Sequence, residues 1–302
     1  GKKIDRALTS AIADGSVIFV EGGKFILKDS QYDSVKIQNA YKSSNKGEVN
    51  LADYTTGMIT GGYNGNAQNT LCGGGICIVN GTFIMKSGMI YRNTAINGAG
   101  IFANSTLSLV EIEDGVINGN MNNEGLTGTF NDIGVGILVS NGAVLNFYNG
   151  IVHKNISNLS SADGAGICYF NAYGKIENGI IANNVLAAKG GGLGAGVYVC
   201  ISTVTISGGK FEYNDGDLGG GIANWSSDLV ISNVYVANNI SNYGGGIHIQ
   251  DNARSTDISN STIINNTADY GGLYLGNMTT NFGPGMQVYG NKLTTGEESN
   301  VY

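Results

Sequence analysis

The segment Gly219–Asn239, GGGIANWSSDLVISNVYVANN, carries the pattern on which the fold depends. A run of glycines precedes the aliphatic residue Ile222, a second apolar residue follows at Ile231, and Asn239 closes the unit. The same landmarks recur along the chain, and repetition of this kind indicates a stacked architecture. Gly219–Asn239 is therefore one repeat of a larger array.

Each landmark occurs once per repeat, and the first recurs at steps of 25 to 36 residues. The first aliphatic positions are Ile76, Ile101, Ile137, Ile167, Val197, Ile222, Ile247 and Leu273. The second apolar positions are Met85, Ile112, Phe147, Ile176, Ile206, Ile231 and Ile258. The closing residues, which we predict to form a structural asparagine ladder, are Asn93, Asn120, Asn155, Asn184, Asn214, Asn239 and Asn266. Landmarks in one fixed order predict a single array rather than separate domains.

Between landmarks the sequence alternates over three to five residues, as in Ile76–Ile78 and Val204–Ile206, which is the period of a strand with one buried face. Strands this short form a core only when identical units stack. We therefore predict an all-β fold, a right-handed single-stranded parallel β-helix with inward columns of aliphatic side chains. Asparagine suits one corner because it tolerates a left-handed backbone and can bond its amide to the next coil. The paired glycines are expected at the opposite bend.

The run GGGI…ISGG.F.YN, which covers roughly residues 58–302, resembles the glycine-rich β-helix repeats of adhesin-like surface proteins. Such repeats are found in Gram-positive gut anaerobes and methanogens, and more distantly in autotransporter passengers. The resemblance implies a secreted or cell-surface rod outside the cell that presents a binding face. A glycan or a host-surface protein is the implied partner.

The composition agrees with an exported rod and disfavours two classes of partner. Charged residues make up 13% of the chain, which has 49 glycines, a net charge of -7 and a pI near 4.8. Nucleic acid and anionic membranes are disfavoured because phosphate binding needs clustered Lys or Arg. No apolar run approaches the ~18 residues that span a bilayer. We expect a monomeric module of a longer chain without a cofactor.

We expect one domain over residues 1–302. Residues Ile4 to Ile12 have apolar side chains at helical spacing, so a capping helix is predicted over 1–14, where it would hide the first coil. Irregular first coils with a long surface excursion are expected over 15–57, and regular coils over 58–290. The tail, 291–302, has no amphipathic helix. We expect that the native chain continues there; the alternative is that the tail folds across the end.

An enzyme is the main alternative function, because many β-helices are polysaccharide lyases or glycoside hydrolases. The R-x-P-x-x-R stretch of pectate-lyase-like sites is absent, since the only proline is Pro284, and no polygalacturonase-like motif occurs. The acids at Glu111–Asp114 and Asp215–Asp217 have no matching basic partner in adjacent repeats, which favours solvated strand and turn positions over a glycosidase pair. His153 and His248 are expected to be surface or packed residues. No catalytic residue is predicted, and a structural stalk segment is the third alternative.

The four cysteines are candidates for disulfide bridges or a zinc site, and the glycine-rich runs are candidates for a calcium roll. Cys72 and Cys77 flank one bend, and Cys168 and Cys200 lie on neighbouring repeats, so either pair could bridge. Free, packed thiols are favoured because a β-helix has an ample core. No zinc spacing occurs. A calcium roll would need Asp where Gly196 stands, so no metal is predicted.

One outward column is unexpectedly apolar. The residues after the first aliphatic positions are Cys77, Phe102, Leu138, Cys168, Tyr198, Ala223, His248 and Tyr274. Insertions at one corner, residues 121–133, 156–163 and 185–193, either fold down over its middle or form the walls of a shallow groove. In the groove alternative the ligand-binding residues are Phe102, Leu138, Tyr198, Trp225 and Tyr274, with Cys168 also in the floor. Such a floor suits sugar rings or a protein partner.

Overall fold

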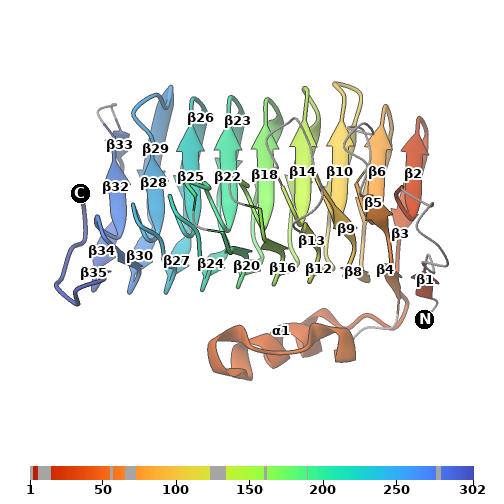
Figure 1. Ribbon diagram of the computed structural model, residues 1–302, viewed down its shortest axis with the longest axis horizontal. Coiled ribbons are helices and arrows are strands. Elements are labelled where there is room, and N and C mark those ends of the chain that lie inside the picture. The colour runs from red at the N-terminus through yellow and green to blue at the C-terminus, as the bar shows by residue number, and fades with distance from the viewer. Residues whose placement is uncertain are drawn as a thin grey trace.

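The computed structural model describes residues 3–5, 15–54, 57–64, 73–122, 134–159, 162–188, 190–276 and 280–302. The chain is a parallel β-solenoid of about seven turns, with 47% of residues in strands and 6% in helices. Figure 1 shows its coils stacked along one axis, with the two termini at opposite ends. The predicted all-β parallel solenoid is confirmed.

Three long parallel sheets form the walls of the solenoid. Sheet 1 contains β2 (Ile18–Glu21), β6 (Ile76–Val79), β10 (Ile101–Asn104), β14 (Ile137–Ser140), β18 (Ile167–Phe170), β22 (Val197–Cys200), β25 (Ile222–Trp225), β28 (Ile247–Ile249) and β32 (Leu273–Leu275). Sheet 2 contains β3 (Lys24–Leu27), β7 (Thr82–Met85), β11 (Leu109–Ile112), β15 (Val144–Phe147), β19 (Tyr173–Ile176), β23 (Thr203–Ile206), β26 (Asp228–Ser232), β29 (Ser255–Ser259) and β33 (Thr280–Phe282). Sheet 3 contains β1 (Lys3–Asp5), β4 (Met58–Thr60), β8 (Met89–Tyr91), β12 (Val116–Asn118), β16 (Ile151–His153), β20 (Ile180–Ala182), β24 (Lys210–Glu212), β27 (Tyr235–Ala237), β30 (Thr262–Ile264) and β34 (Gln287–Tyr289).

Short strands follow the asparagine corner of most coils. A five-stranded sheet contains β5 (Tyr63–Asn64), β9 (Thr94–Ala95), β13 (Met121–Asn122), β17 (Ile156–Ser157) and β21 (Val185–Leu186). A further pair is formed by β31 (Thr267–Ala268) and β35 (Lys292–Leu293). These strands connect the end of sheet 3 to the glycines that precede the next strand of sheet 1.

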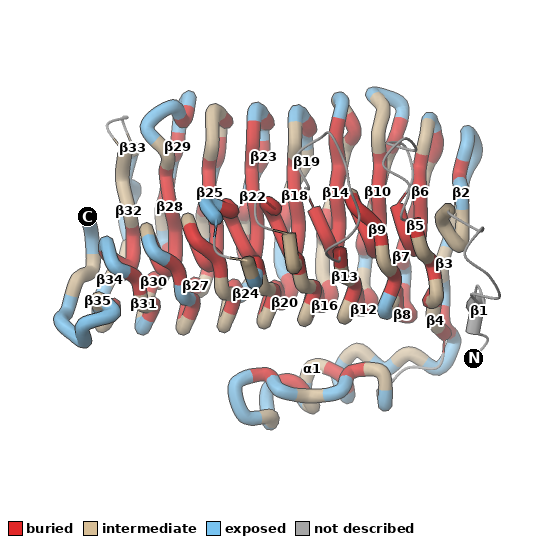
Figure 2. The backbone as a smooth tube through the Cα atoms, in the orientation of Figure 1, coloured by how far each residue is buried: buried red, intermediate tan, exposed pale blue. Residues whose placement is uncertain are grey.

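The repeat landmarks stack in register, as the sequence predicts. Ile101 pairs with Ile137 and Ile137 with Ile167 in parallel ladders, and all eight first aliphatic residues are buried. The seven second apolar positions are also buried, in one core that runs through the stack. Figure 2 shows this buried backbone continuing from coil to coil. Columns of aliphatic side chains removed from water therefore hold the coils together.

The asparagine ladder is present, but its backbone differs from our expectation. The left-handed residue is the one that precedes each ladder asparagine, for example Lys154 (φ 52°) before Asn155 and Asn183 (φ 55°) before Asn184. The asparagine is selected for its amide, whose hydrogen bonds to the next coil are as predicted. The ladder also extends one coil further than expected, to Asn291.

The glycines do not lie at an opposite bend. A Cβ atom on Gly166 would lie 2.4 Å from the carbonyl oxygen of Gly196 and 3.1 Å from Nδ2 of Asn184. Because only a short strand separates each asparagine from the following glycines, the glycine column lies beside the ladder. Close approach of the neighbouring coil requires glycine there.

Among the described residues, the one α-helix lies near the N-terminus but after the segment 1–14 in which the capping helix is expected. Residues 3–5 form strand β1, residues 6–14 lie outside the described residues, and helix α1 spans Ser34–Ser43. Asp33 caps α1 by accepting a hydrogen bond from the backbone N–H of Lys36. The helix and the 3-10 turns Asn45–Gly47 and Leu51–Tyr54 belong to an excursion, residues 28–54, here called the arm.

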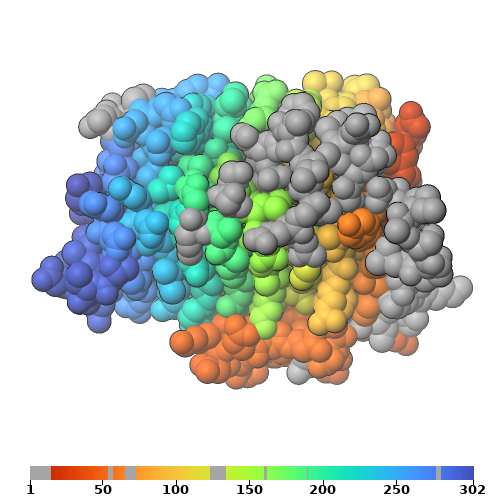
Figure 3. All heavy atoms as spheres, viewed as in Figure 1, coloured from red at the N-terminus to blue at the C-terminus, as the bar shows by residue number. Residues whose placement is uncertain are grey.

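The arm covers an apolar outer stripe of sheet 3. Ile37, Tyr41 and Leu51 pack against Met89, Val116, Ile151 and Ile180, which follow one another on the outer face of the sheet. Figures 1 and 3 show the arm lying along one side of the stack. Burial of these side chains stabilises an excursion that has little apolar periodicity of its own.

The C-terminal residues fold across the last coil. The backbone N–H of Tyr302 donates to the carbonyl of Leu273, and the N–H of Leu275 donates to the carbonyl of Tyr302, both at 2.9 Å. Strand β35 pairs with β31. Within the described ranges, no helix is long and apolar enough to cross a membrane.

Candidate functional site

The middle of the outer column on sheet 1 is covered. Phe102, Leu138 and Tyr198 are 3%, 1% and 4% exposed, and they form an apolar cluster with Leu193 and others, separate from the main core. These three residues therefore do not line an open groove, and the covered-column alternative describes them. An outer face that is apolar and buried contributes to stability rather than to a binding surface.

The predicted insertions start side by side, because β13, β17 and β21 are neighbours in the short sheet. Residues 123–133, 160, 161 and 189 of the expected walls lie outside the described residues.

A buried carboxyl group lies beside the covered column. Asp163 is 9% exposed, and its Oδ1 accepts a hydrogen bond of 2.7 Å from the backbone N–H of Leu193. Burial raises its pKa to about 7. The same burial, with the nearby Asp163 charge, raises the pKa of the Cys168 thiol. Cys168 and Cys200 are free buried thiols, as favoured from the sequence; Cys77 is also buried, and Cys72 lies outside the described residues.

At the C-terminal end the same face becomes aromatic. We call the group Tyr243, His248, Tyr270, Tyr274 and Tyr302 the tyrosine cluster. His248, Tyr274 and Tyr302 stack in sequence, with ring centroids 4.7 and 5.5 Å apart. Tyr243 and Tyr270 stack at 4.4 Å, and their edges contact the first stack. These spacings are close to the ~4.8 Å between parallel strands, so the coil repeat itself sets the stacking distance.

Two columns of the repeat produce this cluster. His248 and Tyr274 continue the outer column of sheet 1, directly after Ala223. Tyr243 and Tyr270 occupy the loop position that Leu193 and Leu218 occupy in earlier coils, as parallel bridges between these residues show. The sequence interpretation included Tyr274 but missed Tyr243, Tyr270 and Tyr302. The sequence contains a signal for Tyr243 and Tyr270, because every residue of this second column directly precedes a glycine of its coil.

The cluster combines buried and exposed aromatic surface. His248 is buried, its Nε2 lies 2.6 Å from Oε1 of Gln250, and burial lowers its pKa, which favours the neutral ring. Tyr270 and Tyr302 are 36% and 59% exposed. The neighbouring Tyr270 phenol raises the pKa of Tyr243. The Tyr243 hydroxyl therefore stays protonated at neutral pH and can donate a hydrogen bond.

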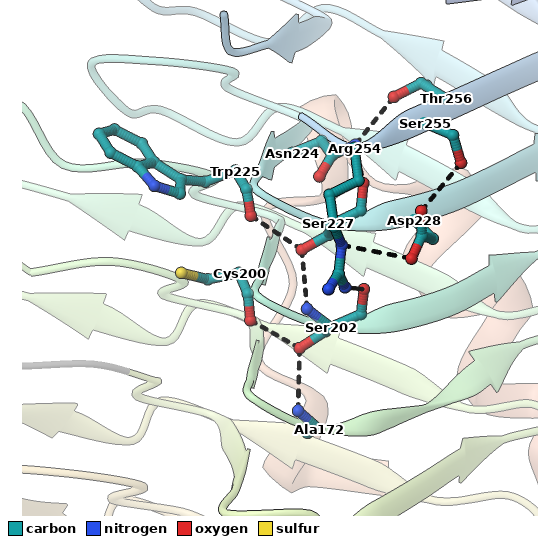
Figure 4. Close-up of polar contacts among 10 residues, drawn as sticks. All are labelled: Ala172, Cys200, Ser202, Asn224, Trp225, Ser227, Asp228, Arg254, Ser255 and Thr256. Carbon is teal, nitrogen blue, oxygen red and sulfur yellow. Dashed lines mark hydrogen bonds and ion pairs between the residues drawn. The ribbon is translucent and has the colours of Figure 1, made fainter. Parts of the chain in front are cut away.

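Trp225 lies at the far end of β25, beside Cys200 of the preceding coil. Figure 4 shows its ring pointing away from a polar corner. In that corner Ser227 Oγ donates to the carbonyl of Trp225 at 2.8 Å and accepts from the N–H of Ser202 at 2.9 Å. Arg254 fixes the same turn through the Ser202 carbonyl at 2.9 Å. Trp225 is half-buried against the covered cluster, and among the described residues it has no ring contact with the tyrosine cluster.

Several acids that could have served a glycosidase have structural partners. Glu113 pairs with Lys86 at the matching position of the preceding coil at 2.9 Å, so the expectation that these acids have no basic partner in adjacent repeats is wrong for Glu113. Asp114 accepts from the Tyr32 hydroxyl at 3.0 Å. Asp217 is buried and accepts from the N–H of Gly191 at 2.5 Å. In the part of the chain that the structure describes, no three His, Cys, Asp or Glu residues are grouped so that they could hold a metal ion.

No protein-family model, curated protein or solved structure matches this chain.

Proposed function

We propose that this protein is a non-enzymatic, exported adhesin-like β-solenoid whose tyrosine cluster binds a neutral glycan. The observation that carries the proposal is the array of five rings on one outer face, of which Tyr270 and Tyr302 are the most exposed. Several aromatic rings grouped on one outer face indicate an interaction site, whereas apolar residues scattered singly over a surface do not.

The chemistry of the cluster suits a sugar. Pyranose rings offer C–H faces that pack on aromatic surface, and hydroxyl groups that pair with phenols and amides at its edge. Gln250 and the tyrosine hydroxyls supply such polar groups beside the rings. The low share of charged residues and the repeat architecture support an exposed location outside the cell.

The charge near the cluster favours a neutral sugar over an acidic one. The pKa of the Tyr274 hydroxyl is raised by burial and then by the Asp251 carboxylate, which places a negative group beside the rings. Asp269, bonded to Thr294, directly precedes Tyr270. A carboxylated or sulfated glycan would be repelled here.

A glycan array followed by calorimetric titration tests the proposal. The double variant Tyr270→Ala/Tyr302→Ala should bind about tenfold or more weakly, because each lost ring contact is worth about 1 kcal/mol. Tyr173→Ala is the matched control, since Tyr173 is 55% exposed but lies on sheet 2. Phe102 and Tyr198 are unsuitable targets, because their removal would open a cavity.

An array without any hit, or equal affinity of the double variant and the parent protein, would contradict the proposal. The first result would favour a stalk segment. Release of new sugar ends during incubation would favour an enzyme.

A further inference from the structure

A pocket lies where the arm ends on sheet 3, on a different wall of the solenoid from the tyrosine cluster, which lies on the sheet 1 face. Its volume is about 320 Å³. Its lining residues include Tyr41, Lys42 and Lys46 from the arm and Ile180, Lys210 and Glu212 from sheet 3. This size is at the lower end of small-molecule sites.

The register of sheet 3 explains the position of the pocket. Ile151 pairs with Ile180, and Ile180 pairs with Lys210, so the apolar outer stripe changes to lysine after β20. The arm packs on the apolar part and stops at the change. One wall of the pocket therefore comes from the arm, and the other comes from the coil in which Lys210 follows the apolar residues of this stripe.

The pocket is basic in a protein of net charge -7. Of the described residues that line the pocket, three are lysines, Lys42, Lys46 and Lys210, and one, Glu212, is acidic. Among the described residues none of the three lysines forms an ion pair, although Lys210 lies over the ring of Tyr235 at 5.4 Å. Like charges gathered around one hollow repel one another unless an anion lies between them.

A second, independent feature points to a ligand. Tyr41 is 4% exposed, and no other residue that the structure describes forms a hydrogen bond with its hydroxyl. The hydroxyl is close enough to Glu212 and Tyr213 for both to raise its pKa, after burial, so it remains a donor. A buried donor without an acceptor is costly, and native proteins rarely leave one unpaired.

We propose that this pocket binds a small ligand through an oxyanion, a carboxylate or phosphate group held by Lys42, Lys46 and Lys210 with the Tyr41 hydroxyl in its wall. An acidic sugar and free inorganic phosphate share this chemistry. The site is separate from the tyrosine cluster and does not depend on the function proposed for it.

Calorimetric titration of the full chain with sodium phosphate, sodium glucuronate and glucose at low ionic strength tests the site. Phosphate, glucuronate or both should bind, added chloride should weaken the binding, and glucose should not compete. Binding of glucuronate alone identifies a sugar acid, and binding of phosphate alone identifies free phosphate. Failure of both anions to bind overturns the proposal.

Variants locate the binding. Lys210→Gln and Lys42→Gln should each weaken it about fivefold or more, and Tyr41→Phe should weaken it without loss of thermal stability. Glu212→Gln should strengthen it, because a repelling carboxylate is removed; a variant that merely disturbs folding would not give this gain. Lys292→Gln, an exposed lysine of the last coil, is the control. Unchanged binding in Lys42→Gln, Lys210→Gln and Glu212→Gln places the anion elsewhere and overturns the site.

Discussion

The side-chain oxygen Oδ1 of Asn214 accepts two hydrogen bonds from Asn184, one from the backbone N–H and one from Nδ2, both at 3.0 Å. Nδ2 of Asn184 also donates to the carbonyl of Val152 at 3.1 Å. Asn155 repeats the arrangement toward Asn184. Each buried amide in the ladder thus satisfies polar groups of the neighbouring coils on both sides.

The ladder predicts a large effect from a nearly isosteric change. Asn184→Asp keeps the oxygen that accepts from Asn155 but loses the Nδ2 donor to Asn214 and Val152. It also places a buried carboxylate against Oδ1 of Asn214 and the carbonyl oxygen of Val152. We expect a loss of about 2 to 4 kcal/mol in the free energy of unfolding, measured by urea denaturation. Asn252→Asp, at an exposed turn, should change stability by less than about 0.5 kcal/mol. Similar losses in the two variants would contradict the ladder.

The glycine column predicts that an added methyl group separates two coils. In Gly166→Ala the new Cβ would lie 2.4 Å from the carbonyl oxygen of Gly196, which is backbone and cannot move freely. We expect a loss of about 2 kcal/mol or more, seen as a lower melting temperature. Gly216→Ala is the comparison, since its Cβ would meet Ala195 Cβ at 3.1 Å. Equal melting temperatures of Gly166→Ala and the parent protein would show that the coils are further apart.

From the raised pKa of the Asp163 carboxyl we predict that the stability of the protein falls as pH rises. The pKa of its carboxyl is about 7 in the folded protein, against an ordinary value of 3.8. Between these values the folded state holds a proton that the unfolded state has released, so stability is lost as pH rises from about 4 through 7. Asp163→Asn keeps an acceptor for Leu193 and should stabilise the protein at pH 8 by up to about 4 kcal/mol, with little effect at pH 4. Denaturant titrations at both pH values measure this, and an equal effect at both would contradict the prediction.

From the lowered pKa of His153, which contacts the arm at Gly47, we predict the opposite pH dependence for the attachment of the arm to sheet 3. Its Nε2 lies 3.0 Å from the Gly47 carbonyl and its Nδ1 lies 3.1 Å from Oδ1 of Asn118. Burial, and then the charge of Lys154, lower its pKa to about 4, whereas the Gly47 carbonyl and Glu48 oppose the shift. Stability that depends on neutral His153 is present above pH 6.5 and is lost as pH falls toward 4, by up to about 3 kcal/mol.

Hydrogen exchange of residues 28–54 at pH 7 and pH 4.5, corrected for the intrinsic rates, measures this effect where it acts. Exchange protection of the arm should fall at the lower pH. His153→Gln, which does not titrate, should remove most of the difference. His248 also has a lowered pKa but lies in the C-terminal coils, so it does not affect the comparison. Equal protection at both pH values would exclude this role of His153.

The sequence alone determined the stacking of the coils. Register follows from side chains that recur at one position per coil, because a column of Ile101, Ile137 and Ile167 is buried only in parallel pairing. The asparagine corner was predictable for the same reason. The glycines were placed at the wrong bend, since their constraint comes from the carbonyl of a neighbouring coil, which no local pattern reveals.

The tertiary structure decided what covers the outside. The sequence pattern of Phe102, Leu138 and Tyr198 is the same for the floor of an open groove and for a buried layer. Only the solvent exposure of these side chains in the structure distinguishes the two alternatives. The arm could not be predicted as a cover, because its apolar contacts with sheet 3 join residues far apart in the chain. The inside of a solenoid repeats from coil to coil, so it can be predicted from the sequence. Its outer surface depends on long-range contacts that each occur once, and such contacts form the tyrosine cluster and the basic pocket.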